Sequence, residues 1–452
     1  MMRWSTAGES HGCRLVAIIE GMPAGIEIST VGLEAELRRR RTGYGRGARQ
    51  KFEQDSCRII SGVRHGKTLG SPIAIEIDNS EWPRWETVMS PDVVDPAELR
   101  KYSGSGDSHE LARNKKLTRP RPGHADYAGA IKFRFDDLRN VLERASARET
   151  AARVALGYVA KEFLRQVAGI VIAGRVVALG TATAVNKTIT LADIQTIEAS
   201  PVRASDPHSE RLFMEQIDHA RKTGDTIGGI AEAIAWNVPP ALGTYTVWSE
   251  RLDGQIAQAM MSIPAVKGVE IGDGFANAIR GGSIAHDELA LEHGMITRES
   301  NHAGGIEGGM TNGEPVVVRI AVKPIPTVPH ALKTVDLATG EPVAANHQRS
   351  DTSAVVPATV IAESMLALTL ASAVLERASG NHLQDIQIHL ENLADQHGAF
   401  LKTSWGYESA RCYRGHARCR KDYRWSYCCQ PFARRVHRFR PFDKSTRRHV
   451  DF

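Results

Sequence analysis

Two hydrophobic patterns alternate along this chain. Short runs rich in branched apolar residues, typical of β-strands, occupy residues 16–19, 73–77, 170–172, 316–322 and 386–388. Longer stretches with apolar residues three or four positions apart, typical of amphipathic helices, occupy residues 31–41, 146–167, 206–223, 251–263 and 358–377. Since no repeat of solenoid period is present, these elements predict an α+β or layered fold whose glycine-rich connections carry the functional residues.

Length and composition indicate a soluble protein with a large core. Length alone suggests two or three domains for 452 residues, although single domains of this size occur. The first residues lack the apolar segment of a secretory signal. The longest apolar stretch, 365–375, is interrupted by Thr369 and Ser372 and falls short of the roughly 18 residues that a membrane span needs. We therefore expect a cytoplasmic protein with no membrane segment.

The last fifty residues differ from the rest of the chain. Residues 403–452 contain eleven Arg and two Lys against four acidic residues, so the remaining chain is mildly acidic and its basic residues act locally. The segment has ten aromatic residues but no Leu or Ile, and its four cysteines lack the paired spacing of zinc sites. We expect a disordered tail outside a main domain of residues 1–402. A segment read out of frame and a nucleic-acid-binding arm stay open as alternatives, and no RNA-binding motif favours the arm.

The turn Gly8-Glu9-Ser10-His11-Gly12 places a titratable imidazole beside a hydroxyl, directly before the apolar run 15–19. Glycines leave the backbone accessible to a ligand, and an imidazole changes its charge near neutral pH. Ser10 and His11 are therefore candidate site residues. Local hydrogen bonding within the turn is the alternative interpretation.

Arginines gather in two further segments. Residues 38–47 contain four consecutive arginines followed by a glycine-rich loop that carries Arg46. A helix capped by Thr30 accounts for part of this charge through its dipole, and the excess favours capture of phosphate groups. In residues 119–126, two prolines stiffen a loop that presents Arg121 and His124, either to an anion or to solvent.

Residues 143–150 and two later segments add further candidates. Ser146 and Glu149 have the spacing of a capping box, so a helix should begin at residue 147 with Arg148 in its first turn, where an anion would be bound. Residues 301–313 form a glycine-rich loop before a strand, typical of close ligand approach or of a linker. Asp351 follows Arg349, and either an ion pair or a base would explain it.

Together these segments predict an enzyme site for a small polyanion, with many arginines, two histidines that could transfer protons, and one carboxylate. The sequence has no Walker lysine motif, no GxGxxG and no metal-binding triad.

The same segments resemble chorismate synthase, and several resemble its actinobacterial branch. The resemblance is carried by GESHGCRLVAIIEGMP from residue 8, ERASARETAARVALGYV from residue 143 and RSDTSAVVPATVIAESM from residue 349, and it extends over about residues 2–376. It implies a β-α-β sandwich that assembles as a homotetramer. It also implies conversion of 5-enolpyruvylshikimate 3-phosphate into chorismate and phosphate by anti-1,4-elimination, with reduced FMN required although no net redox change occurs. NADPH is a possible reductant, and a flavin reductase without lyase activity is the alternative enzyme.

The resemblance also implies roles for individual residues. His11 would be the acid near the departing phosphate, and His124 would protonate or stabilise the reduced flavin. Asp351 would assist proton removal through the flavin, with Ser10 and Ser146 as orienting groups. The positions matching FMN contacts are Arg144, Ala145, Ser146, Pro264, Ala265, Gly308, Lys323, Pro324, Ile325, Pro326, Thr327 and Arg349. Arg40 and Arg46 match NADPH positions, and Arg46, Arg121 and Arg148 are the expected contacts to substrate anions.

Several positions depart from the family pattern. Pro264 stands where relatives usually have Asn or Gln, so only backbone contact to the flavin can remain there. Arg41 and Thr42 replace a common Gln-Gly pair in the arginine segment. The usual family ending after Arg377 is also replaced, and the tail from about Thr403 matches no known family segment.

Overall fold

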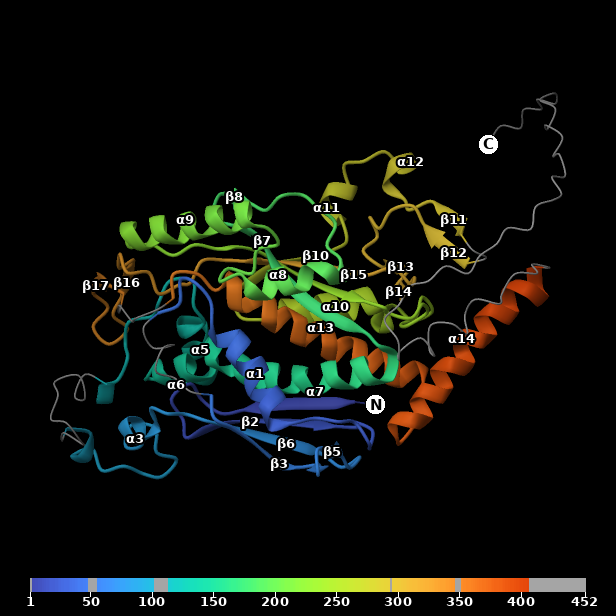
Figure 1. Ribbon diagram of the computed structural model, residues 1–452. Coiled ribbons are helices and arrows are strands. Elements are labelled where there is room, and N and C mark those ends of the chain that lie inside the picture. The colour runs from blue at the N-terminus through green and yellow to red at the C-terminus, as the bar shows by residue number, and fades with distance from the viewer. Residues whose placement is uncertain (1, 48–54, 101–112, 293–294, 346–350, 406–452) are drawn as a thin grey trace, which may run out of the picture.

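Two antiparallel β-sheets enclose a layer of helices in this protein. The computed structural model describes residues 2–47, 55–100, 113–292, 295–345 and 351–405. A four-stranded sheet lies at the bottom of Figure 1 and a five-stranded sheet lies above the central helices. The arrangement confirms the predicted α+β fold and its β-α-β sandwich.

The four-stranded sheet buries one face because its strands alternate apolar and polar residues. Its order is β1 (Arg3–Ala7), β2 (Arg14–Glu20), β6 (Ile73–Asp78) and β3 (Cys57–Ser61). Leu15, Ala17 and Ile19 of β2 are buried, and each pairs with a buried isoleucine of β6. This alternation aims one face of the sheet at the helices.

The five-stranded sheet carries a ladder of opposite charges. Its order is β10 (Val266–Ile271), β15 (Val316–Val322), β9 (Gly229–Trp236), β7 (Val171–Leu179) and β8 (Ala182–Thr183). Glu232 of β9 accepts from Arg175 of β7 at 2.6 Å and from Arg319 of β15 at 2.7 Å. Such cross-strand pairs favour this strand register over a shifted one.

Two long helices form the centre of the sandwich. Helix α7 (Thr150–Ala168) packs on β2, and α13 (Val355–Arg377) packs on α7 and on β7 and β9. Helix α13 is long and apolar enough to cross a membrane by length and composition, but 89% of its most apolar window is buried inside the protein. A helix that is apolar on all sides is expected in the core of a protein of this size.

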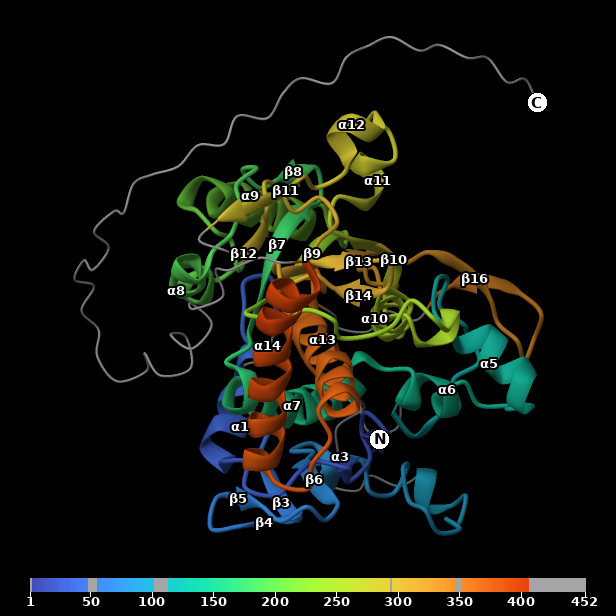
Figure 2. The ribbon, with the colours of Figure 1, turned by 90° about the vertical axis from the view of Figure 1, so that its right-hand side faces the viewer.

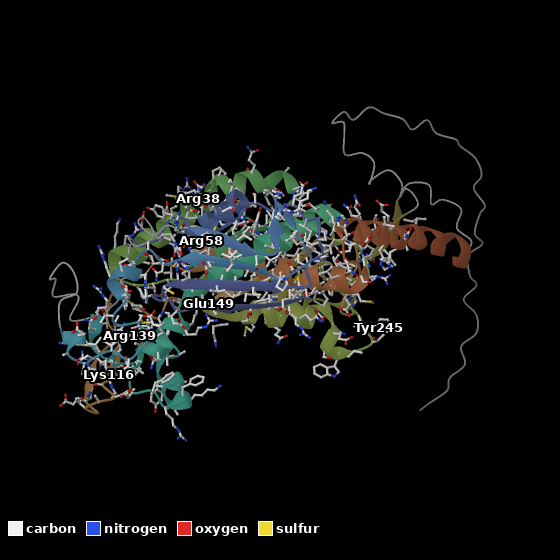
Figure 3. The ribbon with its side chains drawn as sticks, turned by 90° about the horizontal axis from the view of Figure 1, so that it is seen from below. Arg38, Arg58, Lys116, Arg139, Glu149 and Tyr245 are labelled. Carbon is white, nitrogen blue, oxygen red and sulfur yellow. The ribbon has the colours of Figure 1, made fainter. Side chains whose placement is uncertain are left out.

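The remaining elements surround this centre. Helix α14 contacts α7 at its beginning and then extends away from the two sheets (Figures 1 and 2). Seen from below, Lys116 and Arg139 lie at one end of the molecule and Tyr245 lies at the other (Figure 3). The helices are α1 (Thr30–Arg41), α3 (Trp82–Trp85), α5 (Asp126–Phe133), α6 (Arg139–Arg144), α8 (Ile194–Ala199), α9 (Pro207–Thr223), α10 (Leu252–Met261), α11 (Gly274–Asn277), α12 (Gly282–Ala285) and α14 (Leu383–Trp405). The short strands are β4 (Val63–Arg64), β5 (Lys67–Thr68), β11 (Leu289–Glu292), β12 (Met295–Arg298), β13 (Ile306–Glu307), β14 (Met310–Thr311), β16 (Lys333–Val335) and β17 (Pro342–Ala344), and the 3₁₀ turns are η1 (Glu98–Arg100), η2 (Ala147–Glu149), η3 (Leu191–Asp193) and η4 (Trp248–Glu250).

Most predicted elements are present, and two local predictions are wrong. Ser29, not Thr30, caps α1, because its side chain accepts the amide hydrogen of Gly32 at 3.0 Å. The apolar run 386–388 belongs to helix α14 and not to a strand. The first residues of the predicted tail, 403–405, complete α14, and residues 406–452 lie outside the described part of the chain.

The predicted capping box at Ser146 is only half correct. The hydroxyl of Ser146 accepts the amide hydrogen of Arg148 at 3.3 Å, so Ser146 is a cap. Glu149, however, accepts from Thr6 at 2.8 Å and from Arg153 at 3.0 Å. The helical segment after Ser146 therefore begins with the 3₁₀ turn η2, and α7 follows it from Thr150.

Candidate active site

The turn at Gly8–Gly12 is held rigidly between β1 and β2. Gly8 has a φ of 104°, and a Cβ there would lie 2.4 Å from the carbonyl oxygen of Arg14. The buried side-chain amide of Asn79 donates to the carbonyls of Ser10 and Gly12 at 2.9 and 3.0 Å. These contacts give Ser10 and His11 a fixed backbone from which to act.

Both candidate side chains of this turn meet the segment 143–146. His11 Nδ1 lies 2.9 Å from Oε1 of Glu143, and the Oγ atoms of Ser10 and Ser146 are 3.1 Å apart. The imidazole of His11 stacks on the indole of Trp85, with ring centroids 3.8 Å apart and planes inclined by 20°. Ser146, which is far from Ser10 and His11 in sequence, therefore lies beside them in the structure.

The second histidine also has a carboxylate on its Nδ1 atom. His124 Nδ1 lies 2.6 Å from Oδ1 of Asp126, and Nε of Arg121 donates to Oδ2 of the same side chain at 2.8 Å. Burial would raise the pKa of Asp126, but its hydrogen bonds from His124 and Arg121 outweigh burial and hold that pKa well below its usual value. Arg121 is thus engaged by a protein carboxylate at the base of the His124 loop.

The loop of residues 323–327 packs against the His124 loop. Nζ of Lys323 donates to the carbonyl of Gly123, and the amide of Lys323 donates to the carbonyl of Ala265 at 2.9 Å. Ala265 itself adopts a φ of 71°, which is unusual for a residue with a side chain. The structure thereby gathers the positions predicted to contact FMN at Pro264, Ala265, Lys323, Pro324, Ile325, Pro326 and Thr327.

Two of the predicted anion-binding arginines converge on Asp55. Arg40 NH2 lies 3.3 Å from Oδ2 of Asp55, and NH1 of Arg148 donates to Oδ1. Burial would raise the pKa of Asp55, but the two guanidinium groups outweigh burial and lower it. Arg40 and Arg148 are themselves buried, and both pair with the carboxylate of Asp55.

Asp351 forms an ion pair with Arg46. Arg46 NH1 lies 2.5 Å from Oδ2 of Asp351, and the amide of Gly47 donates to Oδ1 at 2.6 Å. The amide of Thr352 donates to the carbonyl of Gly45 at 3.0 Å, so the arginine loop and the segment after residue 350 lie side by side. Arg349 lies outside the described residues.

Two predicted cofactor positions, Arg144 and Ala145, lie at the end of α6, and a third, Gly308, lies between β13 and β14. Arg144 donates to the carbonyls of Thr6 and Gly8 at 3.1 and 3.3 Å, and Ala145 caps α6. Gly308 lies in the turn between β13 and β14, whose Gly309 carbonyl accepts from Leu252 at the beginning of α10. Gly308 therefore lies near the beginning of α10, and Pro264 and Ala265 follow the end of the same helix.

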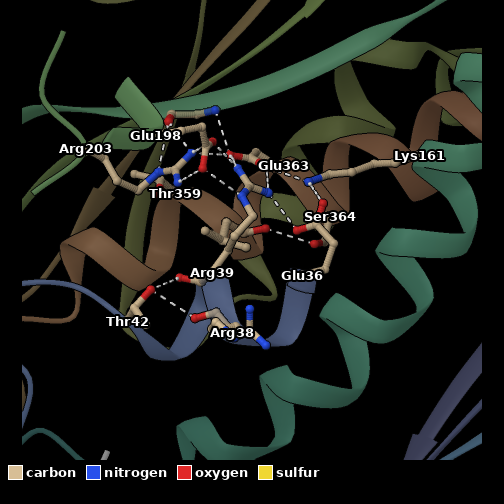
Figure 4. A network of polar contacts seen from close by, with 12 residues as sticks. Glu36, Arg38, Arg39, Thr42, Lys161, Glu198, Arg203, Thr359, Glu363 and Ser364 are labelled. Atoms are coloured by element: carbon tan, nitrogen blue, oxygen red, sulfur yellow. Dashed lines mark hydrogen bonds and ion pairs between the residues drawn. The ribbon is translucent and has the colours of Figure 1, made fainter. Parts of the chain in front are cut away.

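Arg39, within the same arginine run, takes part in a different cluster. The carboxylate of Glu363 on α13 is fully buried and accepts from Arg39 at 2.8 Å, from Arg203 at 2.8 Å and from Lys161 at 2.5 Å (Figure 4). Burial alone would lower the pKa of Arg39, but Glu363, Glu198 and Glu36 raise it above its ordinary value. The excess of arginine in this run is thus partly matched by protein carboxylates, and not only by a ligand.

Comparison with known proteins places these features in a family. The profile described as chorismate synthase matches residues 2–375. This chain belongs to the chorismate synthase family. Chorismate synthase from Nocardia farcinica is 56% identical over 386 residues, covering 85% of this chain and 93% of that protein. Chorismate synthase from Mycolicibacterium vanbaalenii is 55% identical over 393 residues, covering 87% of this chain and 95% of that protein.

A solved structure agrees with this assignment. A crystal structure of chorismate synthase superimposes with a TM-score of 0.69 at 40% sequence identity, covering 87% of this chain and 98% of that one. The chain is therefore an enzyme of the chorismate synthase family, a lyase of aromatic amino-acid biosynthesis. The actinobacterial resemblance is confirmed by relatives from Nocardia and Mycolicibacterium.

Sequence reasoning missed the carboxylates that hold the site of this chorismate synthase family member. Glu143 and Asp55 contact residues far from them in sequence, and nothing local marks them as partners. Asp126 is different, because its spacing from His124 is visible in the segment PGHAD. A histidine two positions before a buried acid was the available signal.

Proposed function

We propose that this chain converts 5-enolpyruvylshikimate 3-phosphate into chorismate and phosphate by anti-1,4-elimination, in a reaction that depends on reduced FMN. The observation that supports this most is the pair of imidazoles, each with Nδ1 against a buried carboxylate, beside loops rich in arginine. The reaction breaks an allylic C–O bond and removes a ring proton, so it needs a proton donor for phosphate and a proton acceptor.

The residues around Ala265 and Lys323 fit a flavin. Lys323 donates to the carbonyls of Ala265 and Gly123, so these three residues are neighbours, and Gly123 directly precedes His124. Backbone groups and one cation near an imidazole are suited to a ring system with polar edges and a phosphate. We infer that residues 264–265 and 323–327 hold FMN with His124 at its edge. When bound and reduced, FMN supplies the electron-rich partner that favours loss of the allylic phosphate.

The substrate's phosphate and two carboxylates require cations. In this proposal Arg46, Arg121 and Arg148 contact these anions while remaining attached to Asp351, Asp126 and Asp55 respectively. A guanidinium group has five donors, so a protein carboxylate on one edge can leave another edge for a ligand. The carboxylates then fix the arginines in place, which lowers the cost of ordering them on binding.

The proton transfers of the elimination fall to His11 and Asp351 in the proposal. His11 gives a proton to the phosphate as it leaves, with Ser10 and Ser146 orienting the same region through their contact at 3.1 Å. Asp351, held by Arg46 and the amide of Gly47, assists removal of the ring proton. These roles divide acid and base work between opposite ends of the elimination.

The test is chorismate formation by the purified full chain. The phosphorylated substrate and FMN are incubated anaerobically, once with dithionite as reductant and once with NADPH, and chorismate is followed by its absorbance. Turnover with dithionite supports the proposal. Turnover with NADPH alone would add flavin reduction to it, and absence of chorismate in both reactions would refute it.

Assembly and location are further parts of the proposal. We propose a homotetramer in the cytoplasm, with residues 1–402 as the catalytic domain. Exposed apolar side chains at the end formed by α11, α12 and β11 support association of copies, because soluble monomers rarely expose so many together. They are Phe275, Ile279, Ile284, Leu289 and Leu291. Sedimentation of the purified chain at micromolar concentration tests the number of copies.

A further inference from the structure

The side chain of Glu143 contacts His11, and the proposed reaction assigns it no role. We propose that Glu143 is a positioning residue that fixes which ring nitrogen of His11 handles the proton. This inference rests on the proposed function, because it assigns a partner to the acid of that reaction.

Glu143 holds His11 at two points. Oε2 accepts the backbone amide hydrogen of His11 at 2.8 Å, and Oε1 lies 2.9 Å from Nδ1 of the same residue. The carbonyl of Glu143 accepts the amide hydrogen of Ser10 at 3.0 Å. The side chain of Glu143 is only 1% exposed, so water does not compete for these contacts. Attachment of both backbone and ring to one carboxylate fixes the side-chain torsions of His11.

Trp85 holds the plane of the same ring. The imidazole and indole stack at 3.8 Å, and the guanidinium groups of Arg113 and Arg139 each lie 5.4 Å from the Trp85 ring. Rotation of the imidazole by half a turn would exchange Nδ1 for a carbon and break the contact with Glu143. The stack and the carboxylate thus support the same orientation.

The chemistry of a carboxylate determines the tautomer. An ionised carboxylate can only accept hydrogen bonds, so Nδ1 of His11 carries the hydrogen in the Glu143 contact. Nε2 is therefore the nitrogen that gives its proton to a phosphate oxygen, and the imidazole left behind is neutral with its hydrogen on Nδ1. The N–H bond at Nε2 breaks, an O–H bond forms on the phosphate, and the Glu143 contact is unchanged.

In the described part of the chain, charged side chains near His11 include residues of α6 and the residue before α3. Glu143 and Arg139 lie on α6, with Arg139 NH1 at 3.9 Å from Oε1 of Glu143. Glu81, the residue before α3, has a carboxylate oxygen 4.0 Å from Nε2 of His11. Replacing Glu143 by a neutral side chain therefore removes the negative charge that directly contacts Nδ1 of His11.

A purely structural role for Glu143 is the alternative, because its carbonyl and carboxylate join α6 to the turn after β1. The matched control is Glu149→Gln, which removes another buried carboxylate that binds Thr6 and Arg153 rather than an imidazole. Both variants should lower thermal stability. Only Glu143→Gln should alter the imidazole of His11.

The experiment combines spectroscopy and kinetics on the full chain. Histidine labelled with ¹⁵N reports the tautomer of His11, with its signals assigned by their loss in His11→Ala. In Glu143→Gln we expect those signals to change from the tautomer with hydrogen on Nδ1 to a mixture of both tautomers. Turnover should fall, by no more than the about 10²–10⁴-fold that a positioned acid contributes. The KM for substrate should change little. Glu143→Asp, which keeps the charge, should recover part of the lost turnover, and Glu143→Gln should cost nothing further in the His11→Ala background.

Each outcome decides the inference. An unchanged tautomer in Glu143→Gln overturns it, and so does a changed tautomer with normal turnover and an unchanged pH–rate profile. An additional loss of turnover in the His11→Ala background would show that Glu143 acts by another route. An inactive wild-type chain would refute the proposed function instead, and the tautomer measurement, which needs no turnover, would still show whether Glu143 fixes the ring of His11.

Discussion

His124 and Asp126 form a pair in which Nδ1 of the imidazole lies 2.6 Å from a carboxylate oxygen whose side chain is only 3% exposed. Asp126 also anchors Arg121, so one acid holds both candidate residues of the proline-stiffened loop. The pairing gives this loop a fixed geometry before any ligand binds. Removal of the Asp126 carboxylate should therefore weaken the loop.

Asp126→Asn should destabilise the chain at neutral pH. The cost should stay below the about 3–5 kcal/mol of breaking a buried ion pair, because Asn keeps one acceptor. The folded pKa of Asp126 is lowered, so its stabilisation is present above the unfolded pKa of about 4 and is lost as the pH falls below it. Urea unfolding from pH 7.5 downward should show the difference from wild type shrinking in acid. The exposed pair of Asp136 with Lys116 gives a control, Asp136→Asn, that should change little.

Gly157→Ala tests the contact between the two central helices. A Cβ at Gly157 would lie 2.3 Å from Cβ of Ser364 and 2.7 Å from its Cα, so α7 and α13 would have to separate. We expect a loss of about 1–3 kcal/mol despite the higher helix propensity of Ala. Gly254→Ala in α10 is the matched control, since nothing lies within 4 Å of its Cβ, and it should be neutral or stabilising. Equal effects of the two changes on the thermal midpoint would contradict the close contact.

Asp55→Asn should destabilise the chain, because the Asp55 carboxylate pairs with both Arg40 and Arg148. The change leaves Arg40 and Arg148 buried with one negative charge fewer, at a cost of up to about 3–5 kcal/mol. Inorganic phosphate should raise the thermal midpoint of this variant more than that of wild type, because an added anion can replace the lost carboxylate. Glu76→Gln removes a carboxylate that pairs with the half-exposed Arg58 and should show no such response. An identical phosphate effect in all three proteins would argue against the Asp55 interpretation.

The sequence pattern predicted the strands and helices that are determined by interactions between residues close in sequence. The strand 316–322 and the helices near 30–41 and 206–223 appear almost as expected, because apolar spacing and capping act within a few residues. The run 386–388 was misassigned because two isoleucines separated by Gln387 cannot distinguish a strand from one turn of a helix. Candidate residues such as His11 stood out by type.

Their partners could not be predicted in the same way. Glu143 lies 132 positions from His11, and Glu363 lies 324 positions from Arg39. Only the packing of α6, α1 and α13 brings these groups together, and no sequence period records that packing. The arginine run shows the consequence, because one of its members binds the core and not a ligand.

Glu363→Gln should be among the most destabilising single changes in this chain. The fully buried carboxylate faces Arg39, Arg203 and Lys161, so an amide would leave three cations without their shared partner. Breaking such a buried pair costs about 3–5 kcal/mol. The exposed neighbour in the same run offers a control, Arg38→Gln, which should stay within about 0.5 kcal/mol of wild type. Chemical denaturation of both variants measures the difference, and a mild effect of Glu363→Gln would mean that the cluster contributes little.

Removal of residues 406–452 separates the alternatives for the tail. The family match ends at residue 375 and the last described helix ends at Trp405, so turnover and thermal midpoint should be unchanged in the shortened chain. The deletion removes eleven Arg and two Lys but four acidic residues, which turns a net basic chain into a net acidic one. Retention on heparin should therefore weaken, since a basic segment with aromatic residues binds polyanions. Specific RNA retention by the full chain at physiological salt, lost on truncation, would favour the nucleic-acid arm, whereas lost turnover would make the tail part of the enzyme.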